Sequence, residues 1–435
     1  MNVLILGLGQ YPHGSGVEAA VFFARRGDDV TVTDLKSAKE LRRNVARLQR
    51  FKNVRFVLGR HDLTDVRRAD LIVRNPRVRS DSREMREAMK RGIPIESDVS
   101  LFLQSCPARV IGVTGTRGKS TTATLIAEMF KAAGRRVWLG GNILVSPLVF
   151  LSRVKPDDLV VLELSSWQLE VLGEKKISPA VAVWTNLMRD HLNTYRGMKE
   201  YAQAKAQIFL HQHSGDRIFL PVDRLFDAFA RRARGHLTRV GRGSSPSARI
   251  VAGTRLKLAG THNEMNAQFA TAVALELGVP VTTIRRVLRT FRGLPDRLEE
   301  IATKHGVRYV NDTTATTPDA TIAALQTERA HRIHLIFGGA DKELQFFEVA
   351  QVIKHARITV YLLPGTAHEK IIRAFRHAGV VWMEVRDLRA AFRSMSEKLR
   401  RGDVVLLSPG CASFGLFKNE FDRGAQFKKI VRRLV

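Results

Sequence analysis

Short apolar runs and longer amphipathic stretches alternate along almost the whole chain. The short runs are rich in Val, Ile and Leu, as in 2–7, 158–166 and 403–410. Between them, apolar residues recur at helical spacing, for example in 17–26 and 263–277. Runs of the first kind predict buried strands, and the intervening stretches predict the crossover helices that join parallel strands. The pattern therefore predicts an α/β protein.

Three units of this kind follow one another, and two breaks separate them. The stretch from Pro94 to Pro107 is interpreted as a connection, and 291–299 (FRGLPDRLE) as a Gly-Pro hinge. A turn-rich segment at 241–253 is expected on the surface of the middle unit. The expected domains are 1–105, Rossmann-like; 106–295, a parallel-sheet domain like those of P-loop ATPases; and 296–435, again Rossmann-like.

Composition excludes several classes of protein. No apolar run among the 435 residues approaches the roughly 18 needed to span a membrane. The opening MNVLILGLG is interpreted as a first strand rather than a signal peptide, and the two cysteines indicate no disulfide framework. A cytoplasmic protein is expected. The net charge of +29 is spread along the chain, which favours a solvated basic surface over a nucleic-acid site.

The sequence GVTGTRGKSTT at 112–122 lies between a predicted strand and a predicted helix. This order is typical of a phosphate-binding loop, although the glycines are spaced G-x-x-G-x-x-G-K instead of G-x-x-x-x-G-K. Backbone N–H groups and the helix N-terminus would hold phosphates, and Lys119 would neutralise their charge. Ser120 or Thr121 would offer a hydroxyl to Mg²⁺.

Two other predicted strands end in acidic residues. Glu163 ends a buried strand at the edge where open α/β sheets bind ligands, so both Mg²⁺ ligation and a salt-bridged helix cap are open. Asp34 ends the second strand, after a glycine-rich turn with a stretched dinucleotide fingerprint, and would meet a ribose hydroxyl. A nicotinamide enzyme does not explain the second nucleotide site. We therefore expect two nucleotides, one of them part of a substrate.

Lys205 occupies an inward position on a predicted helix. In MKEYAQAKAQIF, the apolar stripe runs through Tyr201, Ile208 and Phe209, and Lys205 stands one turn after Tyr201. A buried ammonium is costly, whereas a carbamate on the lysine nitrogen would be an anion able to bind metal. Snorkelling to the surface is the alternative. The preceding segment, TNLMRDH, contributes polar residues at another strand end, namely Asn186, Asp190 and His191.

Further polar residues follow the hinge and the strands of the last domain, where a mobile lid would deliver them to the central site. They are Arg297, Asp312, Lys342, Ser408, Ser413 and Lys418.

Taken in order, G-x-x-G-x-x-G-K-[ST], E-L-S-S-x-Q-L-E, T-N-x-x-x-D-H and the inward lysine resemble the Mur ligases, over nearly the whole chain. The resemblance implies a ligase that uses ATP and Mg²⁺ to join D-glutamate to UDP-N-acetylmuramoyl-L-alanine through an acyl phosphate, in peptidoglycan precursor synthesis. It also implies a monomer with no nucleic-acid partner. The first domain would bind the uridine diphosphate end, the second ATP and the third the amino acid.

The resemblance assigns roles to individual residues. Those implied for ATP are Gly115, Thr116, Arg117, Gly118, Lys119, Ser120, Thr121, Asn266, Arg297 and Asp312. Those implied for the muramoyl nucleotide and the amino acid are Asp34, Lys36, Asn75, Asn142, Gln168, His191, Thr316, Lys342 and Ser413. Those implied for two magnesium ions are Ser120, Glu163, His191 and a carbamylated Lys205, and the catalytic residues would be Lys119, His191 and Lys205.

The sequence departs from the family pattern at three places, and the first two bear on the amino acid that is added. Thr314 stands where many of these ligases carry lysine, Glu420 stands where an aromatic residue is common, and the loop 10–16 is long. A ligase that adds L-glutamate is therefore an alternative. A folylpolyglutamate-synthase-like ligase and a basic nucleic-acid-binding ATPase are alternatives from other classes.

Overall fold

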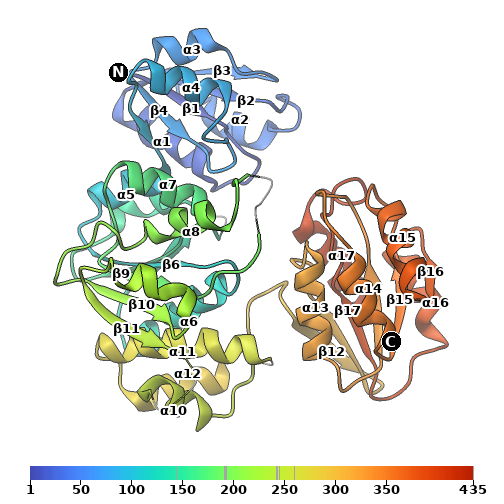
Figure 1. Ribbon diagram of the computed structural model, residues 1–435. Helices are drawn as coiled ribbons and strands as arrows, with labels where there is room; N and C mark the ends of the chain where they lie inside the picture. The colour runs from blue at the N-terminus through green and yellow to red at the C-terminus, as the bar shows by residue number, and fades with distance from the viewer. Residues whose placement is uncertain (144, 191–193, 242, 244, 259, 435) are drawn as a thin grey trace. The chain divides into compact units, whose positions relative to one another are not determined.

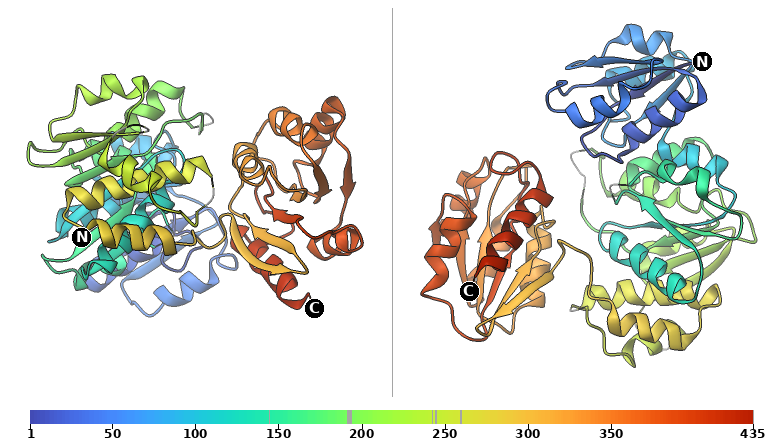
Figure 2. Two further views of the ribbon diagram at one scale, coloured as in Figure 1. Left: turned by 90° about the horizontal axis from the view of Figure 1, so that it is seen from below. Right: turned by 180° about the vertical axis from the view of Figure 1, so that it is seen from behind.

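The computed structural model describes residues 1–143, 145–190, 194–241, 243, 245–258 and 260–434 (Figure 1). The chain divides into two compact units. The first comprises Met1–Leu256 and Thr261–Phe291, and the second Lys257–Gly260 and Arg292–Val435. The first unit contains two sheets and the second contains one (Figures 1 and 2). The predicted α/β class with three sheet domains is confirmed.

The N-terminal sheet is wholly parallel, in the order β3-β2-β1-β4-β5. Its strands are β1 (Asn2–Leu6), β2 (Asp29–Asp34), β3 (Val54–Leu58), β4 (Leu71–Arg74) and β5 (Ile95–Glu96). Alternate strand residues pack on opposite faces. One face is covered by α1 (Ser15–Arg26) and α2 (Arg42–Leu48), the other by α3 (Leu63–Arg68) and α4 (Arg83–Lys90).

The central sheet is also parallel, in the order β11-β10-β9-β6-β8-β7. Its strands are β6 (Arg109–Thr114), β7 (Val137–Gly141), β8 (Leu159–Glu163), β9 (Val181–Trp184), β10 (Arg217–Pro221) and β11 (His236–Val240). The α-helices of this domain are α5 (Asp98–Ser105), α6 (Lys119–Ala132), α7 (Ser166–Glu174), α8 (Met198–Ala206), α9 (Asp227–Ala230), α10 (Pro246–Ala252), α11 (Thr261–Glu276) and α12 (Val281–Thr290). Short 3₁₀ turns are η1 (Pro147–Val149), η2 (Leu151–Arg153) and η3 (Arg224–Phe226).

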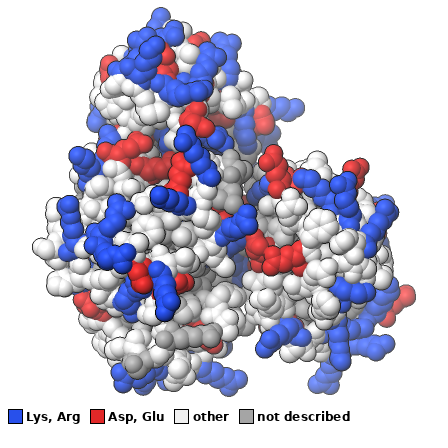
Figure 3. All heavy atoms as spheres, viewed as in Figure 1, with Lys and Arg blue, Asp and Glu red and all other residues white. Residues whose placement is uncertain are grey.

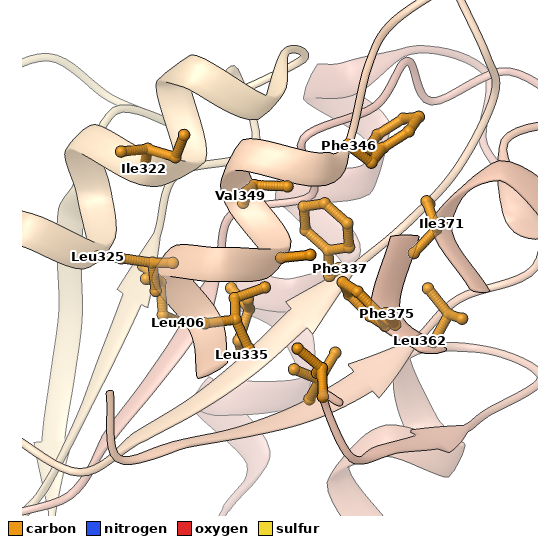
Figure 4. Packing of buried hydrophobic residues seen from close by; sticks show 14 of the residues in the cluster. Ile322, Leu325, Leu335, Phe337, Phe346, Val349, Leu362, Ile371, Phe375 and Leu406 are labelled. Carbon is orange, nitrogen blue, oxygen red and sulfur yellow. The ribbon is translucent and has the colours of Figure 1, made fainter. Parts of the chain in front are cut away.

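The C-terminal sheet has the order β12-β13-β17-β14-β15-β16, and only the pair β12–β13 is antiparallel among its described strand pairs. Its strands are β12 (Glu299–Lys304), β13 (Val307–Asn311), β14 (Ile333–Phe337), β15 (Ile358–Leu362), β16 (Trp382–Glu384) and β17 (Val404–Leu407). One face is covered by α13 (Pro318–Thr327), α14 (Phe347–Lys354) and α15 (His368–Ala378), the other by α16 (Leu388–Ser396) and α17 (Glu420–Arg433). Figure 4 shows Phe337 and Leu335 packed among Phe346, Val349 and Phe375 in the first of these cores.

Two segments that were expected to be loops form helices. The connection after Pro94 contains α5, because Ser97 and Ser100 form a reciprocal capping box with N–H···Oγ distances of 3.0 and 2.7 Å. The turn-rich segment 241–253 contains α10, which Ser245 caps by accepting from the Ala248 N–H at 3.2 Å. β11 and β12 are further strands that the hydrophobic pattern did not predict, and both lie at the edge of a sheet.

No helix in the described part of the chain is both long enough and apolar enough to cross a membrane.

Candidate functional site

The phosphate loop joins β6 to α6 at the carboxyl edge of the central sheet. Gly115 (φ +149°) and Gly118 (φ +76°) have backbone angles that favour glycine. A Cβ on Gly118 would lie 2.1 Å from Asn266 Oδ1, and one on Gly115 would lie 2.0 Å from Thr185 Oγ1. The loop is therefore restricted to glycine twice over. The loop leads into the N-terminus of α6, and Ser120 lies in the first turn of this helix. The backbone N–H groups and the dipole at a helix N-terminus favour the binding of an anion.

Asn186, just beyond β9, holds this loop in shape. Its Oδ1 accepts hydrogen bonds from the backbone N–H groups of Thr116 (3.0 Å) and Arg117 (2.9 Å). Its Nδ2 donates to the Arg117 carbonyl at 2.9 Å, and Thr185 Oγ1 donates to the same carbonyl at the same distance. The sequence pattern placed Asn186 at a strand end, and the structure gives it this role in the loop.

Lys119 and Lys205 converge on the phosphate loop. Lys119 Nζ donates to the carbonyls of Gly115 and Thr116, both at 3.1 Å. Lys205 Nζ donates to the Gly115 carbonyl at 2.8 Å and lies 4.6 Å from the centre of the Tyr201 ring. Lys205 is 1% exposed, so its predicted inward direction is confirmed and snorkelling is wrong.

Burial holds the pKa of Lys205 well below its usual value, and the nearby charge of Lys119 lowers it further. Asp190 and Glu163 act in the opposite direction but more weakly. The amine is therefore disposed to be neutral, which is the nucleophilic form that a carbamate requires.

Glu163 ends β8, between β6 and β7. The Asn142 side chain donates to its Oε1 at 3.0 Å, and the Asn142 N–H donates to its carbonyl at 2.8 Å. The Glu163 side chain is buried, and Oε2 has no hydrogen-bond partner among the described residues. A buried carboxylate oxygen without a partner is costly unless something else occupies its lone pairs.

That free oxygen makes the site compatible with Mg²⁺. In the described ranges, no group of three or more His, Cys, Asp and Glu could hold a metal, and His191 lies outside those ranges. Mg²⁺ is commonly held by one or two carboxylates and by phosphate oxygens of the substrate. Glu163 with a hydroxyl from Ser120 fits that pattern.

Gln168 is buried in the first turn of α7, five residues after Glu163 in the sequence. Its Oε1 accepts from the Ser165 N–H (3.0 Å) and hydroxyl (2.9 Å), and its own N–H donates back to Ser165 Oγ at 3.3 Å. The Gln168 side chain therefore fixes the first turn of α7, which begins just after Glu163.

Asp34 and Asn75 lie at the carboxyl ends of β2 and β4 in the N-terminal sheet. Asp34 accepts from the N–H groups of Gly9 and Lys36, both at 2.9 Å, and Asn75 Nδ2 donates to the Gly7 carbonyl at 3.1 Å. These contacts arrange the glycine-rich turn around one edge of the sheet. The long loop 10–16 is tied to this domain by its neighbours, since Arg47 donates to the Pro12 carbonyl and forms an ion pair with Glu18, and His13 contacts the same glutamate.

In the C-terminal unit, Arg297 lies between two residues in the left-handed region. Asp296 has φ +66° and Leu298 has φ +43°, conformations that non-glycine residues rarely adopt. Asp312 accepts from the Leu298 N–H (3.2 Å) and from Ser408 Oγ (2.8 Å). Thr314 Oγ1 donates to the Asp296 carbonyl at 2.9 Å. The residue that departs from the family pattern thus holds the turn that presents Arg297.

Thr316, Lys342 and Ser413 are predicted to bind the amino acid, and Thr316 lies in the segment that follows β13. Lys342 Nζ lies 3.5 Å from Thr316 Oγ1, and Ser413 Oγ is buried without a hydrogen-bond partner in the part that the structure describes. The fully buried Arg423 supports this segment from α17, donating through Nε to Thr313 Oγ1 (3.0 Å) and through Nη2 to the Thr313 carbonyl (2.8 Å). Burial lowers the pKa of Arg423 to about 10.

Comparison with known proteins identifies the family. The model of the Mur ligase middle domain matches residues 113–249, that of the Mur ligase glutamate ligase domain 296–411, and that of the MurD-like N-terminal domain 1–97. The UDP-N-acetylmuramoylalanine–D-glutamate ligase of Roseiflexus sp. (strain RS-1) is 41% identical, over 99% of this chain and 98% of that protein. The chain belongs to the Mur ligase family. A protein of the same name from Borreliella afzelii (strain PKo) is 35% identical, over 100% and 98%.

Solved structures share the fold of this Mur ligase. MurF from Acinetobacter baumannii has a TM-score of 0.63 at 16% identity, with 99% of this chain and 93% of that chain covered. UDP-N-acetylmuramate-alanine ligase MurC from Thermotoga maritima has a TM-score of 0.61 at 19% identity, with 99% of both chains covered.

Arg423 is a supporting residue of this Mur ligase that the motifs in its sequence did not indicate. It lies with Phe427 and Val431 at spacings of four residues along α17, and all three side chains are buried. Like Lys205, Arg423 is a charged residue on an inward helical stripe, which is the sequence signal of a buried charge.

Proposed function

We propose that this Mur ligase joins D-glutamate to UDP-N-acetylmuramoyl-L-alanine in an ATP-dependent, amide-forming reaction of peptidoglycan synthesis. The observation that carries the proposal is the full-length identity of 41% with a ligase of that name. The convergence of Lys119, Lys205 and Glu163 at one sheet edge supports it, because these residues suit a reaction between anions. The domains 1–105, 106–295 and 296–435 would serve the nucleotide sugar, ATP and glutamate respectively.

The reaction has two steps. A carboxylate oxygen of the alanyl group attacks the γ-phosphorus, and the bond from this phosphorus to the β–γ bridging oxygen breaks. The products of this step are ADP and an acyl phosphate. The glutamate amine then attacks the acyl carbon, loses a proton, and inorganic phosphate departs as the amide forms. Lys119 and the N–H groups at the start of α6 offset the charge on the transferring phosphoryl group. Water must be excluded while the acyl phosphate exists.

Magnesium would be held by Glu163 and Ser120, with His191 and a carbamylated Lys205 at a second ion. When bound, the ions supply positive charge that offsets the repulsion between phosphate and carboxylate. The chain's part is to orient the ligands. Asn142 holds Glu163 by one oxygen and leaves Oε2 available, while the Gly115 carbonyl holds the Lys205 nitrogen in the loop.

The remaining assignments concern substrate recognition. Asn266 Oδ1 accepts a hydrogen bond of 3.4 Å from Thr122 Oγ1 in the first turn of α6, which supports a role for Asn266 in nucleotide binding. Arg297 and Asp312 would complete the ATP site, and Asp34, Lys36 and Asn75 the uridine diphosphate site. Asn142, Gln168 and His191 would line the muramoyl-alanine end.

Lys342 offers a cation, with Thr316 and Ser413 as hydroxyl donors, to an amino acid with two carboxylates. Buried polar groups that match one enantiomer are left unpaired by the other, so one enantiomer of glutamate should be strongly preferred.

The test is phosphate release with UDP-N-acetylmuramoyl-L-alanine, ATP and one amino acid at a time, followed by chiral analysis of the product. D-Glutamate should give the highest kcat/KM, and product should not form when tetrahydrofolate replaces the muramoyl nucleotide. Exclusive incorporation of L-glutamate would support the L-glutamate alternative. ATP turnover that depends on tetrahydrofolate, or on RNA or DNA, would support the alternatives from other classes.

A further inference from the structure

A buried ion pair joins the N-terminal domain to the central domain. Arg74 is the last residue of β4, immediately before Asn75, and its side chain is 2% exposed. Its Nη2 donates to Glu170 Oε2 at 2.8 Å and to the Trp167 carbonyl at 3.1 Å, both on α7. Its Nε is buried with no hydrogen-bond partner among the described residues. A buried ion pair with an unsatisfied nitrogen is weak evidence for a gain in stability. The directed hydrogen bonds of Arg74 instead indicate that the pair positions the two domains.

Glu170 carries the connection further into the central domain. Its second oxygen, Oε1, accepts a hydrogen bond of 2.6 Å from the Tyr195 hydroxyl. Such a short bond from a neutral donor to a carboxylate is charge-assisted and strongly directional. Burial and the neighbouring carboxylate both raise the pKa of Tyr195, so the phenol stays protonated and keeps donating. One carboxylate thus holds Arg74 and Tyr195 at the same time.

Tyr195 in turn packs against the residues that surround Lys205. Its ring centre lies 5.2 Å from that of Tyr201, which is 1% exposed. The Tyr201 hydroxyl donates to Thr116 Oγ1 in the phosphate loop at 3.4 Å, and Lys205 Nζ lies over the Tyr201 ring. Contacts therefore run without a break from the residue beside Asn75 to the amine expected to be carbamylated.

We propose that Glu170 is a positioning residue for the ligase reaction, which sets Lys205 and the phosphate loop relative to the nucleotide-sugar domain through Tyr195. This inference rests on the proposed function. The muramoyl nucleotide is held at one end by the N-terminal domain, while its alanyl carboxylate reacts in the central domain. A displacement of about 1 Å between the two ends can cost on the order of 100-fold in rate. Through Arg74, Glu170 is tied to the domain that would hold the nucleotide, and through Tyr195 it is tied to the residues around Lys205. These contacts would therefore fix the distance between the two ends of the substrate.

The test uses the full-length protein with Glu170→Gln, Tyr195→Phe and the double variant. Tyr195→Phe removes only a hydroxyl, so it remains informative if the Glu170 variant folds poorly. Each single variant is expected to lower kcat about tenfold, with KM for ATP within about twofold of the wild-type value, because ground-state ATP contacts are unchanged. The double variant should be no slower than the slower single variant, since both changes break one connection.

Glu276→Gln is the matched control. Glu276 also accepts from an arginine, Arg217 Nε at 2.6 Å, but this partly exposed pair joins two elements within the central domain, at the amino edge of the sheet. It should leave kcat unchanged.

The proposal is overturned if Glu170→Gln and Tyr195→Phe lower the unfolding temperature but turn over at the wild-type rate per folded molecule, or if their effects on kcat simply multiply. A wild-type enzyme that forms no muramoyl dipeptide would instead contradict the proposed function, because the variants are judged only against wild-type turnover.

Discussion

Lys119 and Lys205 both donate a hydrogen bond to the Gly115 carbonyl in the phosphate loop, and Lys205 is the more deeply buried of the two. Lys119 sits at the helix N-terminus, whereas Lys205 is buried beneath the loop. A permanently charged Lys205 would be unfavourable beside Lys119, and a carbamate would replace that repulsion with attraction. We therefore expect a carbamate to suit this position better than an ammonium ion.

Lys205→Ala is expected to lower kcat at least about 100-fold, as the loss of a preorganised charged group at a phosphoryl-transfer site usually does. Acetate or formate added to the variant should restore part of the rate, because a free carboxylate can enter the space that the side chain vacates. Steady-state kinetics with and without these ions give the measurement. Lys199→Ala, an exposed position on the same helix, is the control. Wild-type turnover by Lys205→Ala would rule out the proposed role.

Thr314 shows how one residue can depart from a family pattern and still serve the site. A lysine at this position would offer a charge, whereas Thr314 donates a hydrogen bond to the Asp296 carbonyl. That carbonyl precedes Arg297 in a turn with two left-handed residues, and such turns persist only when neighbouring contacts hold them.

Thr314→Val is expected to destabilise the protein by about 1 kcal/mol, the usual loss for one hydrogen bond, and to raise KM for ATP because Arg297 is predicted to contact it. Thermal unfolding and ATP kinetics are the measurements. Thr303→Val, which removes an exposed hydroxyl on β12 that donates to Glu300, should change neither. An unchanged KM together with lower stability would limit Thr314 to the turn itself.

At the scale of elements, the sequence predicted the strands of the three sheets better than the short elements between them. Strands such as β8 and β14 are buried on both faces, so their apolar runs are continuous and conspicuous. β12 is an edge strand with exposed and half-buried residues, and its sequence EEIATK carries little apolar signal. α5 and α10 are eight and seven residues long, and their serine caps are visible in the sequence only once helices are already suspected.

The candidate site was predictable for a related reason. Parallel strands bring their carboxyl ends to one edge, so Glu163, Asn142 and the phosphate loop had to be neighbours once the strands were identified. Hydrogen-bond partners were not predictable, because Gln168 and Thr314 use their side chains on local backbone that only the folded structure places.

Polar residues also link two strands of the C-terminal sheet at its amino edge, away from the predicted site residues. Asp403 precedes β17, and Arg332 and His334 lie at the start of β14, with Arg332 Nη2 and His334 Nε2 at 2.6 and 3.1 Å from Asp403 Oδ2. Burial by itself would raise the pKa of Asp403, but hydrogen bonds from Arg332, from the Arg400 N–H and from His334 lower it to about 2.

Because the folded-state pKa of Asp403 lies below its ordinary value of 3.8, its stabilising effect is present above about pH 4 and is lost as the pH falls toward 2. Asp403→Asn should therefore lower the unfolding temperature at pH 7, and its difference from the wild type should shrink between pH 5 and pH 2. Thermal unfolding across this range is the measurement, with the exposed Glu397→Gln as control. A difference that stays constant with pH would mean that the charge of Asp403 does not contribute.

At the scale of the whole molecule, the net charge of +29 is the property that the fold does not explain. On the face shown in Figure 3, Lys and Arg side chains are spread over the described surface, with acidic groups interspersed among them. Many arginines form ion pairs, as Arg308 does with Glu300 and Glu328, yet the excess of basic residues leaves a positive field around the protein. All the proposed substrates are anions, so this field should speed their arrival.

A positive field of this kind predicts a salt dependence that separates association from chemistry. Raising NaCl from about 50 to about 300 mM shortens the screening length from roughly 14 to roughly 6 Å, so long-range attraction is lost while contacts inside the site are little affected. The kcat/KM for UDP-N-acetylmuramoyl-L-alanine should fall severalfold, that for glutamate should fall less because it carries a smaller net charge, and kcat should stay nearly constant. Potassium glutamate is avoided as the salt because it would add substrate. Equal falls in kcat/KM for both substrates would point to a general salt effect on the enzyme, and no fall for either would show that the positive surface does not guide substrates.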